Sequence, residues 1–263
     1  MAPLELLGGS SSEDLLLDMH LNASSEGGKI VAIVQSCYIP WKGYFDLINL
    51  VDEFILYDDR QYTRRDWRNR NRIKTPQGSQ WLTIPVVVKG RYDQRIDDTR
   101  IADPDWADQH WKTLVHNYAS APHFDDYLDT LESIYRKTTD LRLSVVNRTF
   151  LEAISEILGI RTRLSWSTDY EAGGLKTKRL INLCRAAGAT SYLSGPSARE
   201  YMEEGLFEEA GIALEYMDYG GYPEYPQLHP PFDHAVTVLD LIFNTGGEAP
   251  RYMKTFATRK APV

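Results

Sequence analysis

The sequence predicts a three-layer α/β protein with a mainly parallel, Rossmann-like sheet and a helical insertion. A continuous apolar run at residues 30–34 has the composition of a parallel strand that is buried on both faces. A short helical pattern and a second apolar strand at 53–57 follow, and this order is typical of a βαβ unit. After a helical stretch at about 103–160, the alternation of strand and helix patterns resumes at Arg161.

The first unit and the insertion contain further elements. We expect the helix of the first unit at residues 46–51 and a third strand at 81–88, in which Pro85 marks an edge or a bulge. The middle of the chain then shows three helical patterns, at 105–118, 125–137 and 141–158. We interpret this block as a helical insertion or a lid.

The second half of the chain alternates again. Strands are predicted at 162–166, 191–193 and 212–217, and helices at 176–187, 198–210 and 236–244. A loop rich in proline and tyrosine at 223–231 precedes the last helix. Residues 1–28 contain runs of glycine and serine and are expected to form a flexible N-terminal extension, so that residues 29–263 make up a single α/β domain.

The composition excludes several classes of protein. The chain has 263 residues and a formal net charge of -8, whereas a general nucleic-acid binder is normally basic. No apolar run approaches the ~20 residues that a membrane span needs, so we expect no membrane association. Cys37 and Cys184 lie far apart, which excludes a disulfide framework and a cysteine-cluster zinc site and favours a cytoplasmic location.

A dense cluster of cations and amides at residues 64–74 reads RRDWRNRNRIK. The planar guanidinium of arginine can donate two parallel hydrogen bonds to a phosphate or carboxylate. Asparagine can bind hydroxyl groups, and tryptophan offers an apolar ring face. Because Trp67 and Trp81 flank the cluster, a sugar-phosphate pocket is favoured over a solvated charged hairpin. The predicted substrate-binding residues of this cluster are Arg68, Asn69, Arg70, Asn71 and Lys74.

A polar, aromatic loop at residues 35–44 leaves the first strand. Ligands of parallel sheets bind beyond the carboxyl ends of the strands, so we expect this loop and the segment 58–71 to converge on one site. Gly43 would allow the backbone to approach a ligand closely. Cys37 is either a nucleophile or a packed thiol. The substrate-binding candidates of the loop are Gln35, Cys37, Tyr38, Trp41, Gly43 and Tyr44.

Further candidates lie in the second half of the chain. The helix that begins at residue 176 carries cations in its first turn, which oppose the helix dipole and indicate a bound anion. His229 and His234 are expected to help close the pocket, and they lack a third ligand for a metal. The substrate-binding candidates of this half are Lys176, Thr177, Ser194, Gly195, Tyr201, Tyr225 and Gln227.

Three residues are candidates for catalysis. Asp58 ends the second strand and Asp240 lies within an apolar helix, and either would accept a proton from an amine. The alternatives for Asp58, together with Asp59, are capping a turn, pairing with arginine, holding magnesium or binding a ribose hydroxyl. Asp240 is otherwise a satisfied buried carboxylate. Arg199 would offset developing charge.

Several long strings, in order along the chain, carry a family resemblance. They are QSCYIPWKGYFDLIN, VDEFILYDDRQYTRRDWRNRNRIKTPQG, WLTIPV, HWKTLVHNYASAP, KTKRLINLCRAAGATSYLSGPSAREYM, YPQ and LDLIFNTGG. The chain resembles the WbqC-like protein family over nearly all of residues 29–247. That family is tied mainly to gene clusters for O-antigen and other surface glycans and to natural-product pathways, some of which make amino sugars with an amide-linked acyl group. Cys37 stands where the family pattern QSNYIPW has asparagine.

A weaker resemblance concerns the fold. The string VQSCYIPWKGYFDLI is similar to the opening strand, loop and helix of HIGH-type nucleotidyl transferases and pantothenate synthetase. Those enzymes hold ATP phosphates with a histidine-bearing turn, and Lys42 and Tyr44 stand nearest to the places of the missing histidines. The turn at residues 194–199 is similar to their late serine-rich, arginine-bearing loop.

The resemblance implies an enzyme that acts on a nucleotide-activated or phosphorylated small molecule, an amino sugar above all. The expected reaction is acyl or aminoacyl transfer to an amine by a transferase or ligase, with ATP and magnesium left open as cofactors. A non-catalytic ligand-binding or scaffold subunit and a tRNA- or carrier-protein-dependent acyltransferase are the alternatives. The expected partner is a small anionic or sugar-nucleotide substrate. A carrier protein and a second copy of the chain are left open as further partners.

Overall fold

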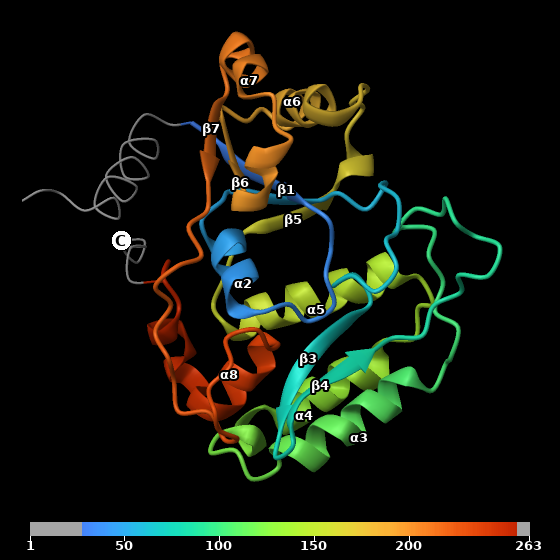
Figure 1. The fold of residues 1–263 in the computed structure, drawn as a ribbon, viewed down its shortest axis with the longest axis vertical. Coiled ribbons are helices and arrows are strands. Elements are labelled where there is room, and N and C mark those ends of the chain that lie inside the picture. The colour runs from blue at the N-terminus through green and yellow to red at the C-terminus, as the bar shows by residue number, and fades with distance from the viewer. Residues whose placement is uncertain (1–27, 257–263) are drawn as a thin grey trace, which may run out of the picture.

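A computed structural model describes residues 28–256 of the chain, so the extension expected at residues 1–28 lies outside the described residues except for Gly28. Its centre is a sheet of five parallel strands in the order β5-β2-β1-β6-β7 (Figure 1). The strands are β1 (Ile30–Val34), β2 (Glu53–Leu56), β5 (Arg163–Trp166), β6 (Ser191–Ser194) and β7 (Ala213–Tyr216). The predicted mainly parallel sheet is confirmed.

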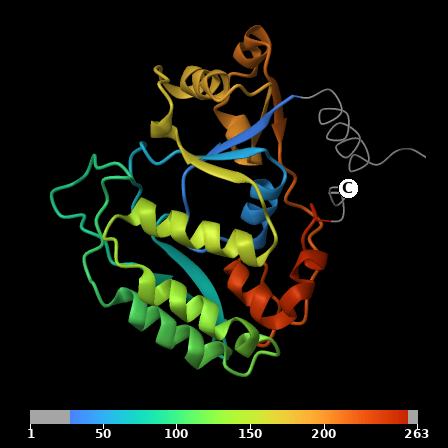
Figure 2. The same ribbon diagram turned by 180° about the vertical axis from the view of Figure 1, so that it is seen from behind.

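Helices cover both faces of the sheet (Figures 1 and 2). They are α6 (Lys176–Ala186) and α7 (Glu204–Ala210) on one face, and α2 (Lys42–Asn49) and α5 (Leu143–Ile157) on the other. Side chains of β1 alternate between two cores, because Ile30 and Ala32 pack with α2 and α5 whereas Val31 and Ile33 pack with α6 and α7. The three-layer α/β architecture is therefore confirmed.

Most of the remaining elements pack beyond α2 and α5, away from the sheet (Figure 1). They are the antiparallel hairpin of β3 (Arg70–Thr75) and β4 (Gly78–Thr83), the helices α3 (Trp106–Tyr118), α4 (Phe124–Lys137) and α8 (Val238–Thr245), and the short helix η3 (Gly246–Tyr252). The short helices η1 (Ser167–Asp169) and η2 (Pro196–Glu200) instead follow β5 and β6 directly, and Ala198 of η2 packs with α6 and α7. The predicted helical insertion thus consists of α3, α4 and α5, and its last helix covers the sheet.

The third strand expected at residues 81–88 is wrong. The strand β4 ends two residues before Pro85, which has no amide hydrogen, and it pairs with β3 in a separate antiparallel sheet. No residue pattern predicts β3, because its buried residues are Asn71, Ile73, Lys74 and Thr75. Only one of these is apolar, so an apolar alternation is missing.

Two predicted helices differ in extent. The helix expected at 46–51 begins four residues earlier, because all of α2 is buried between the sheet and the rest of the core. The helix expected at 198–210 is interrupted between η2 and α7, where Met202 packs into the core and the hydroxyl of Thr177 accepts the amide hydrogen of Glu203 at 3.3 Å. The other predicted helices and strands agree with the structure to within two residues at each end.

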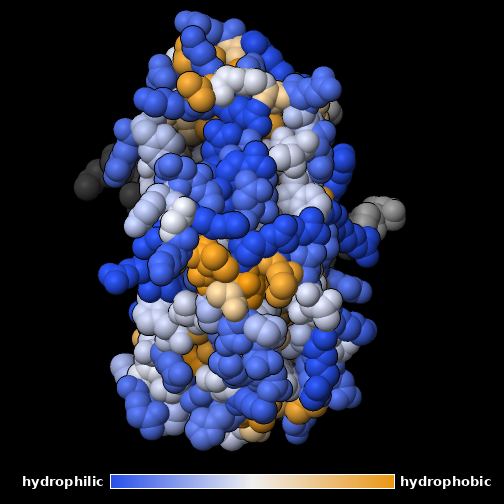
Figure 3. All heavy atoms as spheres, turned by 90° about the vertical axis from the view of Figure 1, so that its right-hand side faces the viewer, coloured by the Kyte–Doolittle hydropathy of each residue, from blue (hydrophilic) through white to orange (hydrophobic). Residues whose placement is uncertain are grey.

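Within residues 28–256 no helix combines the length and the apolar character that a membrane span requires. Figure 3 shows that hydrophilic side chains cover most of one side of the molecule, with a hydrophobic patch near mid-height. Small patches of this kind are ordinary on protein surfaces.

Candidate functional site

The loop that leaves β1 at residues 35–41 meets the segment that leads into β3. The amide of Tyr38 donates a hydrogen bond to the carbonyl oxygen of Trp67 at 3.1 Å. The guanidinium of Arg68 donates to the carbonyl oxygen of Gln35 and to the Sγ of Cys37, both at 3.0 Å. The structure therefore brings together the two segments that we expected at one site.

The same loop contains a strained turn. Ile39 has a φ of +35°, a conformation that β-branched residues rarely adopt. The carboxamide of Asn71 donates to the carbonyl oxygens of Tyr38 and Ile39 at 3.2 and 2.8 Å and so holds the turn. Backbone strain of this kind gathers at functional sites, which favours a ligand-binding role for the loop.

The loop forms one wall of a cavity of about 330 Å³. The other walls come from the start of the hairpin and from the loop before α8, and the polar groups are a thiol, a carboxamide and an imidazole. The lining residues are Cys37, Pro40, Trp41, Tyr44, Trp67, Asn71, His234 and Ala235. Aromatic walls with a few polar groups are typical of a small-molecule site.

The aromatic residues of the loop differ in their surroundings. Trp41 and Tyr44 line the cavity, and the hydroxyl of Tyr44 donates to the carbonyl oxygen of Gln35 at 3.0 Å. Tyr38, in contrast, is fully buried in the core. A Cβ atom at Gly43 would come within 2.3 Å of the indole of Trp41, so Gly43 accommodates this ring, and the expected close approach to a ligand stays a prediction.

Other polar groups of the cationic cluster are bound to the protein itself. The carboxamide of Asn69 accepts from the hydroxyl of Tyr62 at 2.9 Å and donates to the carbonyl oxygen of Ile84 at 2.8 Å. The ammonium of Lys74 is buried and donates to the carbonyl oxygen of Pro231. These contacts stabilise the hairpin, and the binding roles of Asn69 and Lys74 stay predictions.

Two basic groups beside the cavity were not among the substrate-binding or catalytic candidates. His234 lines the cavity, and within residues 28–256 its buried Nδ1 has no hydrogen-bond partner. Burial and the nearby charge of Lys42 lower the pKa of His234, so the imidazole is neutral at pH 7. Lys42 is buried 5.1 Å from the ring centroids of both Tyr222 and Tyr225, and burial lowers its pKa to about 8. A single lysine in a polar loop gives no sequence signal of such burial.

The thiol of Cys37 is protonated at neutral pH. Burial raises its pKa to about 11, although the neighbouring guanidinium of Arg68 opposes this shift. A nucleophilic role requires the thiolate, so the structure favours the packed thiol over the nucleophile.

Asp58 is buried at the end of β2 and joins three segments. Its carboxylate accepts the amide hydrogen of Ser36 at 2.8 Å and the hydroxyl hydrogen of Ser144. From the same helix as Ser144, Asn147 donates to the hydroxyl of Ser36 and to the carbonyl oxygen of Arg68, both at 2.9 Å. Asp58 therefore holds the β1–α2 loop against α5, and its role as a proton acceptor stays a prediction.

Replacement of Asp58 by Asn is expected to make the stability of the protein less dependent on pH. Burial raises the pKa of Asp58, so the folded state binds this proton more tightly than the unfolded state. The resulting stabilisation is complete below about pH 4 and is lost as the pH rises through the folded pKa, by up to ~1.4 kcal/mol per pH unit. Asn keeps the shape and stays neutral, so D58N should gain free energy of unfolding relative to the wild type as the pH rises.

Urea titrations at several values between about pH 4 and pH 7 measure this gain. Asp129→Asn, on an exposed position of α4, is the matched control and should follow the wild-type profile. Parallel profiles for D58N and the wild type would contradict the buried-carboxylate account.

Asp240 is the centre of a second buried network. Its carboxylate accepts hydrogen bonds from the hydroxyls of Tyr118 and Tyr225 at 2.8 and 2.7 Å and from the amide of Gln227 at 2.8 Å. The hydroxyl of Tyr118 in turn accepts the backbone amide hydrogen of Lys74 at 2.9 Å. Four predicted site residues thus meet here, Lys74 through its backbone amide, but both carboxylate oxygens are occupied, and catalysis by Asp240 stays a prediction.

The candidates near the ends of β6 and α6 form a separate group. The hydroxyls of Thr177 and Ser194 contact Met202 and Tyr192, which pack on the α6–α7 side of the sheet. None of these candidates lines the 330 Å³ cavity. The guanidinium of Arg199 lies over the ring of Tyr216 at 4.5 Å, and Tyr201 is 69% exposed. This group also includes Lys176, Thr177, Ser194 and Gly195. The structure therefore divides the predicted site between two regions.

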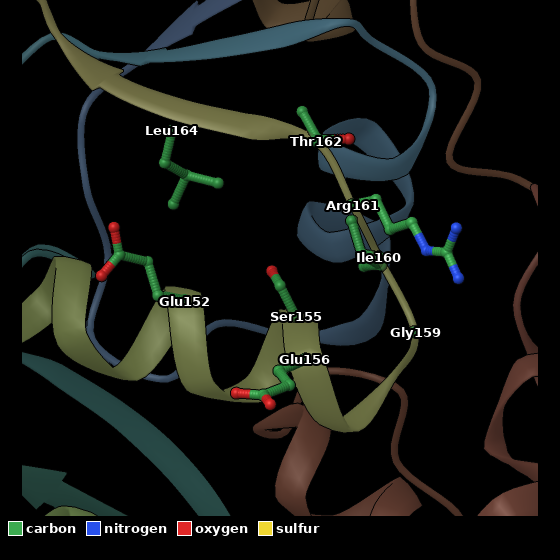
Figure 4. Close-up of a pocket in the computed structure, with 8 residues that line it drawn as sticks. All are labelled: Glu152, Ser155, Glu156, Gly159, Ile160, Arg161, Thr162 and Leu164. Carbon is green, nitrogen blue, oxygen red and sulfur yellow. The ribbon is translucent and has the colours of Figure 1, made fainter.

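A second cavity, of about 490 Å³, opens between α5 and β5 (Figure 4). Its lining includes Glu152, Ser155 and Glu156 from the helix and Leu164 from the strand. Glu152 is paired with Arg148 at 2.7 Å. None of the predicted site residues lines this cavity. Among the described residues no group of three or more histidine, cysteine or acidic side chains is arranged to hold a metal ion.

A model of the WbqC-like protein family matches residues 35–252. The chain belongs to this family. The Mycobacterium tuberculosis (strain ATCC 25618 / H37Rv) protein named Uncharacterized protein Rv1507c is 57% identical to this WbqC-like protein over 226 residues, which are 86% of this chain and 98% of that protein. No solved structure matches the chain. Every residue that lines the 330 Å³ cavity of this WbqC-like protein lies within the matched region.

Proposed function

We propose that this WbqC-like protein is an enzyme of glycan or natural-product biosynthesis that transfers an acyl or aminoacyl group to the amine of an activated amino sugar. The observation that carries the proposal is the 330 Å³ cavity, in which aromatic walls surround a neutral imidazole. The flat faces of Trp41, Tyr44 and Trp67 suit the apolar face of a sugar ring. Its volume lies near the lower end of the range of about 300–1,000 Å³ for ligand sites, which suits a group of sugar size.

Amide formation needs a base at the amine. The amine nitrogen attacks the acyl carbonyl carbon, a C–N bond forms, and the bond from that carbon to its leaving group breaks. The nitrogen must lose one proton, which the neutral imidazole of His234 can accept. The acyl donor is activated either through ATP, with magnesium, or as a thioester or ester on a carrier protein or tRNA, and an assay with each donor separates these routes.

The biosynthetic setting supports the proposal by association. The resemblance to the WbqC-like family implies surface-glycan pathways such as O-antigen synthesis, and natural-product pathways. Both cysteines are free and buried, which supports a cytoplasmic location, where activated sugars are made.

His234→Ala is expected to lower turnover by about 100-fold or more and to leave ligand binding nearly unchanged, because a general base contributes about 10²–10⁴ to the rate. Mass spectrometry of a panel of amino-sugar nucleotides, incubated with the protein, ATP, magnesium and amino acids, measures turnover. Calorimetry with the same nucleotides measures binding. His116→Ala, at an exposed position of α3, is the control. Equal turnover of H234A and the wild type would contradict this role for His234.

The second candidate function is a non-catalytic ligand-binding subunit. It is favoured by the occupation of both predicted catalytic carboxylates, Asp58 and Asp240, by hydrogen bonds within the protein. This function predicts that the wild type binds an amino-sugar nucleotide and converts none of the panel. Absence of binding by every phosphorylated ligand would exclude both functions.

A further inference from the structure

The outer face of the β3–β4 hairpin carries an aromatic and cationic surface. The ring centroids of Trp67 and Trp81 are 5.4 Å apart, and the two side chains are 42% and 41% exposed. The guanidinium of Arg70 lies over the ring of Trp81 at 4.0 Å, and that of Arg72 lies at 5.9 Å. We call these four residues the hairpin ledge.

The strand geometry places the ledge next to the cavity. Successive side chains of a strand point to opposite faces, so Arg70 and Arg72 share the outer face while Asn71 points to the β1–α2 loop. Trp81 is paired with Arg72 in the antiparallel register. Because Trp67 both contacts Trp81 and lines the cavity, the two surfaces are continuous.

The ledge is more cationic than the chain as a whole, whose net charge is -8. Arg72 approaches one carboxylate, that of Asp233, at 3.8 Å, and Asp233 also accepts a hydrogen bond from Ser79 at 2.8 Å. Arg70 donates to the backbone carbonyl oxygen of Arg65, whose own side chain is exposed. The two guanidinium groups of the ledge thus have a single carboxylate, that of Asp233, beside Arg72, which favours an anionic ligand.

We propose that the hairpin ledge binds the nucleoside diphosphate part of a nucleotide-activated sugar, with the base stacked on the tryptophans and the phosphates at Arg70 and Arg72. This inference rests on the proposed function, because the sugar is the part that enters the cavity. A cavity of about 330 Å³ is too small for a whole nucleotide sugar at the usual packing of ligand sites, so the nucleotide must lie outside it. Trp67 is the point where a ligand leaving the cavity meets the ledge.

Single-stranded nucleic acid uses the same stacking and ionic contacts, so it is the competing ligand for this surface. The acidic balance of the chain opposes a long polyanion, whereas a diphosphate needs only the local cations. We therefore commit to the mononucleotide and test the oligonucleotide beside it.

The test is calorimetry with UDP, ADP, uridine, inorganic pyrophosphate and a short single-stranded oligonucleotide. UDP or ADP should bind more tightly than uridine or pyrophosphate, because only they carry both a base and phosphates.

Trp81→Ala should weaken nucleoside diphosphate binding about tenfold, and Trp81→Phe should retain most of it. Tyr92→Ala is the matched control, because it removes an exposed aromatic residue that also lies beside an arginine, Arg64. It should leave the affinity for nucleoside diphosphates unchanged. Arg70→Ala should weaken binding and reduce its dependence on salt.

Each outcome decides between the alternatives. Unchanged affinity for UDP and ADP in both W81A and R70A would overturn the proposed role of the ledge. Tight oligonucleotide binding without binding of UDP or ADP would overturn it too. Transfer to amino-sugar nucleotides with an unchanged KM in W81A would overturn the ledge and leave the proposed function intact. If the wild type binds nucleoside diphosphates but shows no turnover, and W81A loses this binding, the role of the ledge would be supported and the proposed transfer overturned.

Discussion

Replacing Asp240 by Ala is expected to lower the free energy of unfolding by about 3–5 kcal/mol. The change leaves the hydroxyls of Tyr118 and Tyr225 and the amide of Gln227 without the carboxylate that each of them binds. A buried donor that loses its acceptor costs about 1–3 kcal/mol, and three donors lose theirs together. The charge of Lys74, which lies near this carboxylate, is also left uncompensated.

Urea denaturation monitored by tryptophan fluorescence measures this loss. Asp240→Asn keeps one acceptor oxygen and should cost less, about 1–2 kcal/mol. Asp129→Ala, exposed on α4, is the matched control and should remain within about 0.5 kcal/mol of the wild type. If D240A were as stable as this control, the network could not be a principal support of the fold, and a direct catalytic role for Asp240 would gain weight.

Replacing Arg68 by Ala is expected to weaken the binding of every ligand of the cavity about tenfold. It should also lower the free energy of unfolding by about 2–3 kcal/mol. The guanidinium bonds to the carbonyl oxygens of Gln35 and Ser36 and to the thiol of Cys37. Without it the cavity wall that these residues form is no longer held against the hairpin. All three contacts come from one nitrogen, Nη1. Arg68→Lys should recover only part of both losses, because its compact and more strongly hydrated ammonium is a poor substitute for the planar guanidinium.

The two roles considered for Arg68 give different binding results. A phosphate clamp would lower affinity for glucosamine 6-phosphate and leave glucosamine unchanged, whereas a wall support lowers both alike. Calorimetry with this pair of ligands, together with urea denaturation, distinguishes the roles. Arg136→Ala, at an exposed position of α4, is the control for loss of an arginine. A selective loss of the phosphorylated ligand, with full stability, would contradict the wall support.

The positions of most elements were predictable because their signals are local. The parallel strands are short apolar runs, and α3 shows buried residues such as Trp106, Trp111 and Leu114 at helical spacing. The hairpin was missed for the opposite reason. The buried residues on its two faces include Asn71 and Lys74, which pack only because other segments bind their polar atoms. An apolar pattern cannot report a face of this kind.

The candidate site was predictable only as a meeting of two segments. The topology of a parallel sheet places the loop after β1 near the region after β2, and the contact between Arg68 and Gln35 joins them. The sequence also identified Trp41 and Asn71, which line the cavity, but not the importance of His234. A lone histidine in a proline-rich loop has no periodicity that separates a cavity residue from a surface one.

The sequence by itself determined the fold class, the family and the set of polar residues from which a site can be built, because these depend on residue type and order. Only the tertiary structure decided which of these groups remain open to a ligand. Asp240 is bound by Tyr118 from 122 residues away and Asp58 by Ser144 from 86 residues away. A hydrogen bond requires its two groups to be close in space, but they can be any number of residues apart in the sequence. The partner of a buried carboxylate is therefore known only when the chain has folded.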